Sequence, residues 1–356
     1  NPDIVVGTIT ISNGIFCSEG DQIFLQTCRF NRALHGKFYA DLDRNGCDTT
    51  DIPFTNFKFS HFTNGGSNQY ISSNTSSYSI ILKDGLNTLV PIAANNNLII
   101  SPDTVILNWP EDSLSLNQDF CVNIMDDYSD LGITVYPLTQ ARPGFNAKYR
   151  IQYQNNGTLE KMGSIQLSFP SSLATFQSSS STPDQIMPGQ LTWSYNDLVA
   201  FETRHIDLTF ALNSPMDIPP LQGGEILSFA AQIEPTINDI NMDDNTFELY
   251  QNVVNSFDPN DKICLNGNFI DPDAIGDEVQ YMIRFENTGS ANAINIEVTD
   301  TIDTNKFDIN SLKILSTSHP CHTTIINNEI TFTFDEINLS FNDEDNDGFI
   351  LFSIKT

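Results

Sequence analysis

The chain has 356 residues, of which 45 are acidic and 16 are lysine or arginine, so its formal net charge is −29. A chain this acidic repels phosphate backbones and anionic lipid head groups, and we expect it to bind neither nucleic acid nor a membrane surface. No apolar run approaches the roughly 20 residues of a membrane span, so direct membrane insertion is not expected. The 25 Phe and 10 Tyr indicate a folded, strand-rich chain rather than a disordered acidic tail.

Short segments of alternating apolar residues run along the chain and predict β-strands, whereas helical periodicity is nearly absent. Typical segments are 80–82, 149–153, 165–169, 281–285 and 330–334. Gly, Asn and Asp separate them and supply the positive φ that tight connections need. Strands at this spacing predict an all-β protein built from β-sandwich domains.

The strongest local signal of function is the acidic segment 41–51. Alternating acidic and amide side chains lead into Gly46 there, and two more acids follow. Calcium prefers several oxygen ligands around a tight turn. The segment differs from an EF-hand loop because Ile52 stands where a bidentate Glu would close the site. The predicted calcium ligands are Asp41, Asp43, Asn45, Asp48 and Asp51, with the backbone carbonyl of Cys47. The alternative is a solvated acidic hairpin turn.

Two other acidic segments give weaker signals. Asp343, Asp345 and Asp347 precede a glycine in the same way, but no acid follows soon, so a calcium site there would be incomplete and a solvated loop is the alternative. The run 243–245, Asp-Asp-Asn, suits either side-chain capping of a turn or a cation held between carboxylates.

An internal repeat sets the domain organisation. The segment 144–157 recurs as 276–289 at an offset of 132 residues, and each copy carries an aromatic-x-Ile-x-aromatic strand that ends in Asn-x-Gly. A second block, 191–198, recurs as 330–337 at an offset of 139 residues. Two units therefore share a fold and differ by loop insertions.

The repeat divides the chain into four parts. Residues 1–32 are expected to be closing strands of an upstream unit, and the other predicted parts are 33–125, 126–254 and 255–356. The second copy lacks counterparts of two strands that end the first copy, so we expect it to be incomplete at its C-terminus. Either the polypeptide continues with these strands, or another chain or an unassigned segment pairs with the open edge.

Catalytic and zinc motifs are missing from the sequence. The chain has five His and shows no His-Glu-x-x-His, no Gly-x-Ser-x-Gly and no phosphate-binding glycine loop, so we expect no enzyme. Its six Cys include no Cys-x-x-Cys pair. Four of them fall in the first 125 residues, which is typical of an oxidising, extracellular setting with one or two disulfides. Buried free thiols are the alternative, and the residues alone leave the pairing open.

Several motifs of the last hundred residues occur together. They are Ser256 to Lys262, the 276–289 repeat, Asp300 to Asp303, Ser318-His319-Pro320 and Phe332-x-Phe334-x-x-Ile337. This set resembles a domain of Bacteroidetes cell-surface proteins that lies just before a C-terminal type IX secretion sorting domain. Residues 126–254, which open with Ala141-Arg142-Pro143-Gly144-Phe145, resemble the related Ig-like module of the same proteins.

Residues 33–125 resemble the B-type, prealbumin-like modules of surface adhesins. Those modules open with a strand and an acidic turn, here Gly36 to Gly46, and often hold calcium. In such a module Cys47 follows the first strand and Cys121 lies on the last strand. The resemblance therefore implies a disulfide between Cys47 and Cys121.

The resemblance implies a non-enzymatic structural or adhesive stalk of a secreted, surface-displayed protein with a role in adhesion or gliding. The implied partners are the type IX secretion machinery, reached through a sorting domain outside this chain, and a surface ligand that the sequence does not name. The implied location is extracellular, at the outer-membrane surface or secreted. The alternative is an accessory or carbohydrate-binding part of a secreted hydrolase, for which sugars would stack on exposed aromatic residues. Trp109 and Trp193 are the only tryptophans, and Trp193 lies at an alternating core position.

Overall fold

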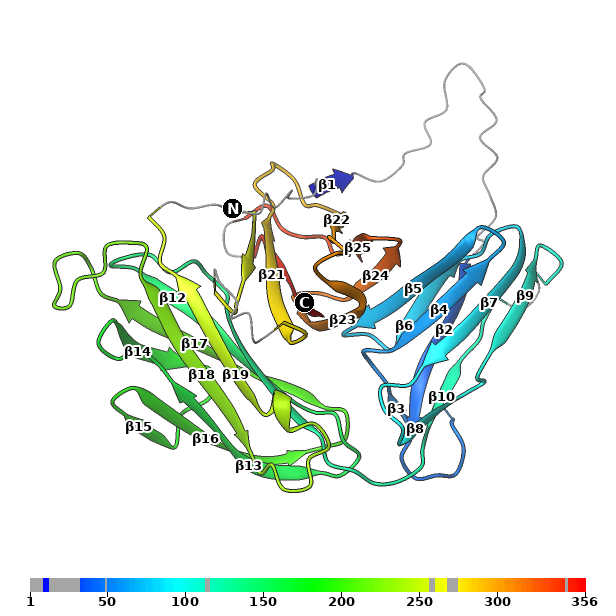
Figure 1. Ribbon diagram of the computed structural model, residues 1–356, viewed down its shortest axis with the longest axis horizontal. Coiled ribbons are helices and arrows are strands. Elements are labelled where there is room, and N and C mark those ends of the chain that lie inside the picture. Colours follow the sequence, from blue (N-terminus) through cyan, green and yellow to red (C-terminus); the bar gives the residue numbers. More distant parts are fainter. Residues whose placement is uncertain are drawn as a thin grey trace, which may run out of the picture. The chain divides into compact units, whose positions relative to one another are not determined.

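The computed structural model describes residues 9–12, 33–48, 50–112, 116–255, 260–267, 275–342 and 345–356. These residues form β-strands, with one short 3-10 helix, η1 (Met242–Asp244), so the all-β prediction is confirmed (Figure 1). No helix in this part of the chain is long and apolar enough to cross a membrane. The chain forms two compact units. Unit 1 comprises Asn1–Met125, Asn260–Lys262 and Met282–Thr356. Unit 2 comprises Asp126–Pro259 and Ile263–Tyr281.

Unit 2 contains a β-sandwich of two antiparallel sheets. The strand order of one sheet is β11 (Leu131–Pro137), β12 (Asn146–Asn155), β17 (Thr203–Leu212) and β14 (Ala174–Ser179). The order of the other is β15 (Gln185–Met187), β16 (Gln190–Leu198), β13 (Lys161–Ser168), β18 (Ile226–Glu234) and β19 (Thr246–Asn252). Inward aromatic residues join the sheets, since the Tyr149 ring on β12 lies 4.4 Å from the Phe229 ring on β18. This packing is what the alternating pattern predicts.

Residues 33–125 form a second sandwich, within unit 1. Its strands are β2 (Ala33–Asp41), β3 (Ile52–Pro53), β4 (Lys58–Thr63), β5 (Gly66–Ser73), β6 (Ser77–Ile81), β7 (Gly85–Ile92), β8 (Leu98–Ser101), β9 (Val105–Trp109) and β10 (Phe120–Ile124). Phe38 on β2 stacks on Phe57 and on Phe120, with ring centroids 3.9 and 4.7 Å apart. Tyr78 packs edge-on against Phe38 and completes an aromatic core.

The C-terminal sandwich repeats the strand order of unit 2. Its strands are β20 (Asp261–Cys264), β21 (Glu278–Glu286), β22 (Asn295–Thr301), β23 (Asp308–Thr317), β24 (Cys321–Ile326), β25 (Glu329–Phe334) and β26 (Asp347–Lys355). The order β20-β21-β26-β23 matches β11-β12-β17-β14, and β22-β25-β24 matches β13-β16-β15. The sequence repeat is therefore a repeat of structure.

The two copies differ where β18 pairs with β13 in unit 2. At the equivalent edge of the C-terminal sandwich, β22 pairs instead with β1 (Ile9–Ser12), in the register Ile9 with Val298 and Ser12 with Asn295. Residues 9–12 belong to the segment that the sequence predicts to close an upstream unit. In the described residues this segment pairs with β22 at the position that β18 takes beside β13 in unit 2.

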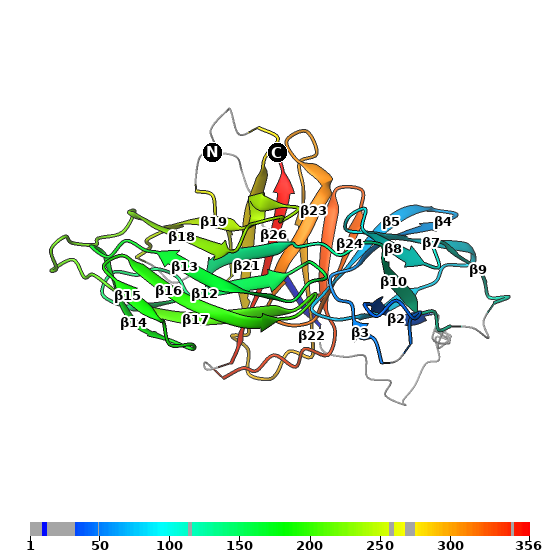
Figure 2. The ribbon, with the colours of Figure 1, turned by 90° about the horizontal axis from the view of Figure 1, so that it is seen from below.

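The C-terminal sandwich and the 33–125 sandwich share one sheet. β24 pairs antiparallel with β5, in the register Cys321 with Ser73 and Ile325 with Gln69. The result is an eight-stranded sheet in the order β1-β22-β25-β24-β5-β4-β7-β9, in which β24 and β5 lie side by side (Figures 1 and 2). Sequence repeats and turn signals do not indicate this pairing.

The Asn-x-Gly turn that ends the repeated strand has a structural role. Asn155 Nδ2 donates hydrogen bonds to the carbonyl oxygens of Leu159, 2.8 Å, and Leu198, 3.0 Å, while Asn155 Oδ1 accepts one from the Gly157 amide. A Cβ on Gly157 would lie 2.6 Å from the Tyr128 carbonyl oxygen, so only glycine fits there. The motif therefore ties the end of β12 to the end of β16.

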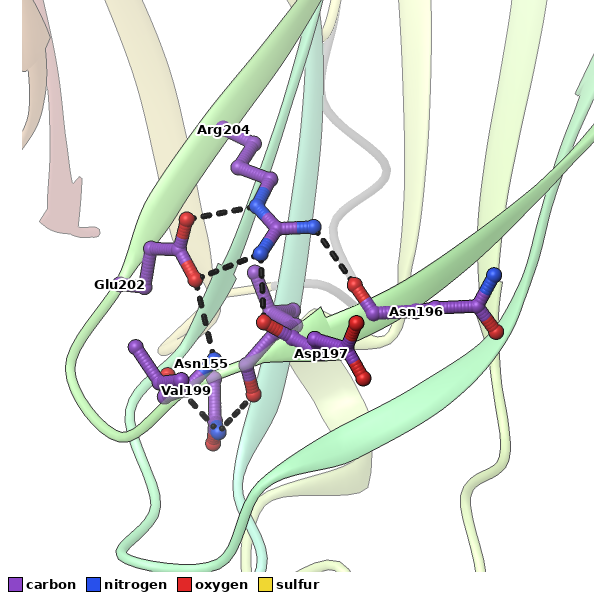
Figure 3. A network of polar contacts seen from close by, with 7 residues as sticks. Asn155, Asn196, Asp197, Val199, Glu202 and Arg204 are labelled. Atoms are coloured by element: carbon purple, nitrogen blue, oxygen red, sulfur yellow. Dashed lines mark hydrogen bonds and ion pairs between the residues drawn. The ribbon is translucent and has the colours of Figure 1, made fainter.

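The adjacent turn between β16 and β17 is braced by Arg204 (Figure 3). Its guanidinium pairs with both oxygens of Glu202, at 2.6 and 2.8 Å, and also donates to the carbonyl oxygens of Asn196 and Asp197. These bonds hold Asp197 at a φ of 52°, and the Arg204 hydrogen bonds lower the pKa of Glu202. The network supports the turn and involves no free reactive group.

Candidate metal centre

The acidic segment 41–51 begins at the last residue of β2, and Asp41 organises it. The Asp41 side chain is buried, and its carboxylate accepts hydrogen bonds from the backbone amides of Asn45 and Gly46, each at 3.1 Å. Gly46 has a φ of 96°, a conformation that glycine adopts without strain. The chain therefore turns back around the Asp41 carboxylate.

This turn gathers three carboxylates. One oxygen from each of Asp41, Asp43 and Asp51 lies within 4.8 Å of the others. Ligands on opposite sides of a calcium ion, each about 2.3–2.6 Å from it, lie about 4.6–5.2 Å apart. The three residues therefore fit a divalent cation.

The two other predicted ligands of this loop have different partners. Asn45 Nδ2 donates to Asp43 Oδ2 at 2.8 Å, so this amide lies against the cluster and holds the Asp43 carboxylate in place. Asp48 Oδ1 accepts from the amide and the hydroxyl of Thr50, both at 2.6 Å, and these bonds lower the pKa of Asp48. The structure thus brings together three of the five predicted acidic and amide ligands and turns Asp48 toward Thr50.

A disulfide closes the loop on the neighbouring strand. Cys47 and Cys121 are bonded, with their Cα atoms 5.5 Å apart. β10, which carries Cys121, pairs in parallel with β2, and Cys121 lies opposite Tyr39. The implied pairing is therefore the one that the structure contains, and it anchors the acidic loop to β10. Cys17 and Cys28 lie outside the described residues.

The described acids of the second predicted calcium segment do not come together as those of the 41–51 loop do. Asp345 and Asp347 are exposed, and neither belongs to an acidic cluster in the part of the chain that the structure describes. Asp343 lies outside the described residues. Between the two acids, Asn346 is buried and donates to Glu286 Oε1 at 2.8 Å, so this segment packs against the end of β21.

Two reactive side chains, Cys321 and His61, are buried in the cores of the sandwiches. Cys321 is fully buried, and burial raises the pKa of its thiol to about 12, so the thiol stays protonated at neutral pH. His61 is also buried, where its Nε2 lies 3.0 Å from Asn87 Oδ1, and burial lowers the pKa of His61. Both groups have the environment of structural core residues.

Comparison with known proteins finds one matching family model and several similar solved structures. The family model described as a domain of unknown function, DUF7619, matches residues 258–356. No curated protein matches. Among solved structures, the CARDB domain of a Pyrococcus furiosus protein in complex with di-metal ions is 16% identical, with a TM-score of 0.26 over 37% of this chain and 98% of that one.

Two further structures are similar to parts of the chain. CaCohA2 from Clostridium acetobutylicum is 14% identical, with a TM-score of 0.26 over 37% of this chain and 93% of that one. A DUF3823 family protein from Bacteroides ovatus is 14% identical, with a TM-score of 0.22 over 57% of this chain and 90% of that one.

Proposed function

We propose that this chain is a non-enzymatic, structural or adhesive stalk region of a secreted, surface-displayed bacterial protein exported by the type IX secretion system. The observation that carries the proposal is the strand pairing between β5 and β24. Tandem domains usually move against each other unless their interface is large. A shared sheet removes that freedom, which suits a stalk that must hold its shape.

Side chains reinforce this joint within unit 1. Asn74 Nδ2 donates to the carbonyl oxygen and the hydroxyl of Thr317, both at 2.9 Å. Lys58 Nζ donates to the Asn310 carbonyl oxygen at 3.2 Å. The Tyr70 ring on β5 lies 5.3 Å from the His322 ring on β24. Backbone pairing, polar contacts and ring packing therefore act together across the joint.

Calcium in the 41–51 loop and the Cys47–Cys121 disulfide fit the same proposal. A cation bound by Asp41, Asp43 and Asp51 would neutralise charges that otherwise repel one another at the end of β2. Disulfides persist in oxidising compartments, so the bonded pair favours an extracellular location. Both features stiffen the 33–125 sandwich without any catalytic role.

The carbohydrate-binding alternative has little support from the tryptophans. Trp109 is 8% exposed and Trp193 is 2% exposed, and Trp193 Nε1 donates to the Ser181 carbonyl oxygen. Neither ring offers a flat surface on which a sugar could stack. This burial favours the stalk over an accessory module of a hydrolase.

Surface labelling of the source bacterium tests the proposal. Antibodies raised against this chain should label intact cells, and external protease should remove the label while a periplasmic marker survives. Deletion of the type IX translocon should abolish the label. Antigen that stays in the cytoplasm of wild-type cells would contradict surface display.

Hydrogen exchange tests the rigid joint separately. In the full chain, backbone amides of β5 and β24 that pair across the joint should exchange together, at the rate of the most protected amides of unit 1. Fast exchange of β24 alone would show that the two sandwiches separate, and the joint could not then carry the stalk proposal.

A further inference from the structure

A second acidic cluster lies inside unit 2, away from the 41–51 loop. Asp130 directly precedes β11, whereas Asp239 and Asp244 belong to the connection between β18 and β19, with Asp244 at the end of η1. One carboxylate oxygen from each lies within 4.8 Å of the others. Because β11 and the β18–β19 pair belong to opposite sheets, the cluster spans the sandwich.

Asn245 supplies an observation independent of the acids. It is 1% exposed, and its Nδ2 donates to the Leu131 carbonyl oxygen at 2.6 Å and to Asp239 Oδ2 at 3.2 Å. Both partners are acceptors, so the orientation of the amide is determined. Asn245 Oδ1 is then buried with no hydrogen-bond donor, on a side chain whose amide nitrogen contacts the Asp239 carboxylate. A buried carbonyl oxygen without a donor is unfavourable unless something else binds it.

The carboxylates supply a second buried oxygen without a hydrogen-bond donor. Asp244 Oδ1 is buried and has no hydrogen-bond partner. Hydrogen bonds of Asp239 to the amides of Leu131, 2.7 Å, and Asn241, 3.0 Å, hold that carboxylate in place. The cluster therefore brings carboxylate and amide oxygen atoms together, and hydrogen bonds hold the Asp239 carboxylate in position.

We propose that Asp130, Asp239, Asp244 and the amide oxygen of Asn245 form a binding site for a divalent cation, with calcium as the ion that fits best. All donors are oxygens, which hard cations prefer, and neither His nor Cys is present to favour zinc. One oxygen of each carboxylate lies within 4.8 Å of the others, close enough for all three to contact one calcium ion. A carbonyl-type oxygen among carboxylates is a further feature of calcium sites.

Such an ion would cross-link the two sheets of unit 2. It would hold the start of β11 against the connection between β18 and β19, where Asn245 already bridges Leu131 and Asp239. The role lies beyond the stalk proposal and does not depend on the 41–51 loop.

Calcium titration of the full chain tests the site. All measurements start from the Asp43→Ala variant, called the parent, in which the predicted loop site is removed. The parent is first treated with a chelator to remove bound ions. Native mass spectrometry and calorimetry with CaCl2 should show one bound ion, and Asp244→Asn in this background should weaken its binding at least tenfold. The matched control is Asp243→Asn, which removes a neighbouring exposed acid and should leave binding unchanged. Unchanged binding in Asp244→Asn, or no binding by the parent, would overturn the proposal.

Hydrogen exchange of the parent provides a readout that needs no variant of the cluster. Addition of CaCl2 should slow amide exchange in two separate segments, around Asp130 and in 236–246, while MgCl2 at equal concentration should protect them less. Calcium-dependent protection that appears only elsewhere in the chain would assign the bound ion to another place and overturn the proposal.

Discussion

Asn155 and Asn287, which lie 132 residues apart, make matching hydrogen bonds in two sandwiches. Asn287 Nδ2 donates to the carbonyl oxygens of Ala291 and Leu339, both at 3.0 Å, and its Oδ1 accepts from the Gly289 amide. Both side chains are almost fully buried. The equivalent residue therefore ties the end of the repeated strand to the chain at the end of β16 in one repeat and after the end of β25 in the other.

Replacement of either asparagine by alanine should destabilise its own unit. Asn155→Ala leaves the buried Leu198 carbonyl oxygen without this donor, and Asn287→Ala does the same at Leu339, so each should lower the free energy of unfolding by about 1–3 kcal/mol. Chemical denaturation of the full chain would measure the loss. Asn196→Ala, which removes an exposed side chain, is the control, and an equal loss there would disprove the structural role.

Loss of the disulfide should destabilise unit 1. The Cys47–Cys121 bond closes a loop with a sequence separation of 74 residues, and removal of such a constraint from the unfolded chain costs about 2–4 kcal/mol. Cys47→Ser combined with Cys121→Ser should show this loss in thermal or chemical unfolding, and reducing agent should reproduce it in the wild type. Cys264→Ser, which changes a cysteine outside the disulfide, should unfold like the wild type under both conditions.

Substitution of Asp43 and substitution of Asp48 should affect calcium binding by the 41–51 loop differently. Asp43→Ala should remove one calcium-binding event from a calorimetric titration of the full chain, because Asp43 is one of the three gathered carboxylates. Asp48→Ala should retain that event, because Asp48 is bonded to Thr50. Identical heats for wild type and Asp43→Ala would rule out the loop site, and loss of binding in Asp48→Ala would show that the loop rearranges on binding.

Acid should weaken unit 1 through two histidines of its eight-stranded sheet. Burial lowers the pKa of His61 on β4 and of His322 on β24, although the Asn87 hydrogen bond and the Asp335 charge respectively oppose the shift. The unfolded chain then binds protons more readily than the folded chain. This contribution to stability is complete above the unfolded pKa of about 6.5 and is lost as pH falls toward the lowered folded values.

Denaturant unfolding between pH 7.5 and 5 checks this expectation. His61→Gln combined with His322→Gln should flatten the decline in the stability of unit 1, whereas His205→Gln, an exposed residue of unit 2, should leave the decline unchanged. A decline of the same steepness in the double variant would assign the acid sensitivity to other groups.

Local patterns of the sequence predicted the strands, the two repeats and the acidic loop that gathers Asp41, Asp43 and Asp51. Alternation with a period of two residues reports which side chains face a core, and Asn-x-Gly turns report where strands end, because both depend on a few neighbouring residues. Asp41 and Asp43 were predictable for the same reason. Asp51 lies in the same loop, so its approach to them also follows from a short closed turn.

Tertiary structure alone decided the relationships between distant segments. The pairs β1–β22 and β24–β5 form through backbone hydrogen bonds at strand edges, which every residue except proline can make, so no side-chain pattern indicates them. Asp130 meets Asp239 and Asp244 only because the fold places the start of β11 against the β18–β19 connection, more than a hundred residues later in the chain. Whether an acid joins an acidic cluster, as Asp43 does, or caps a turn, as Asp48 does, depends on where the folded backbone points its carboxylate.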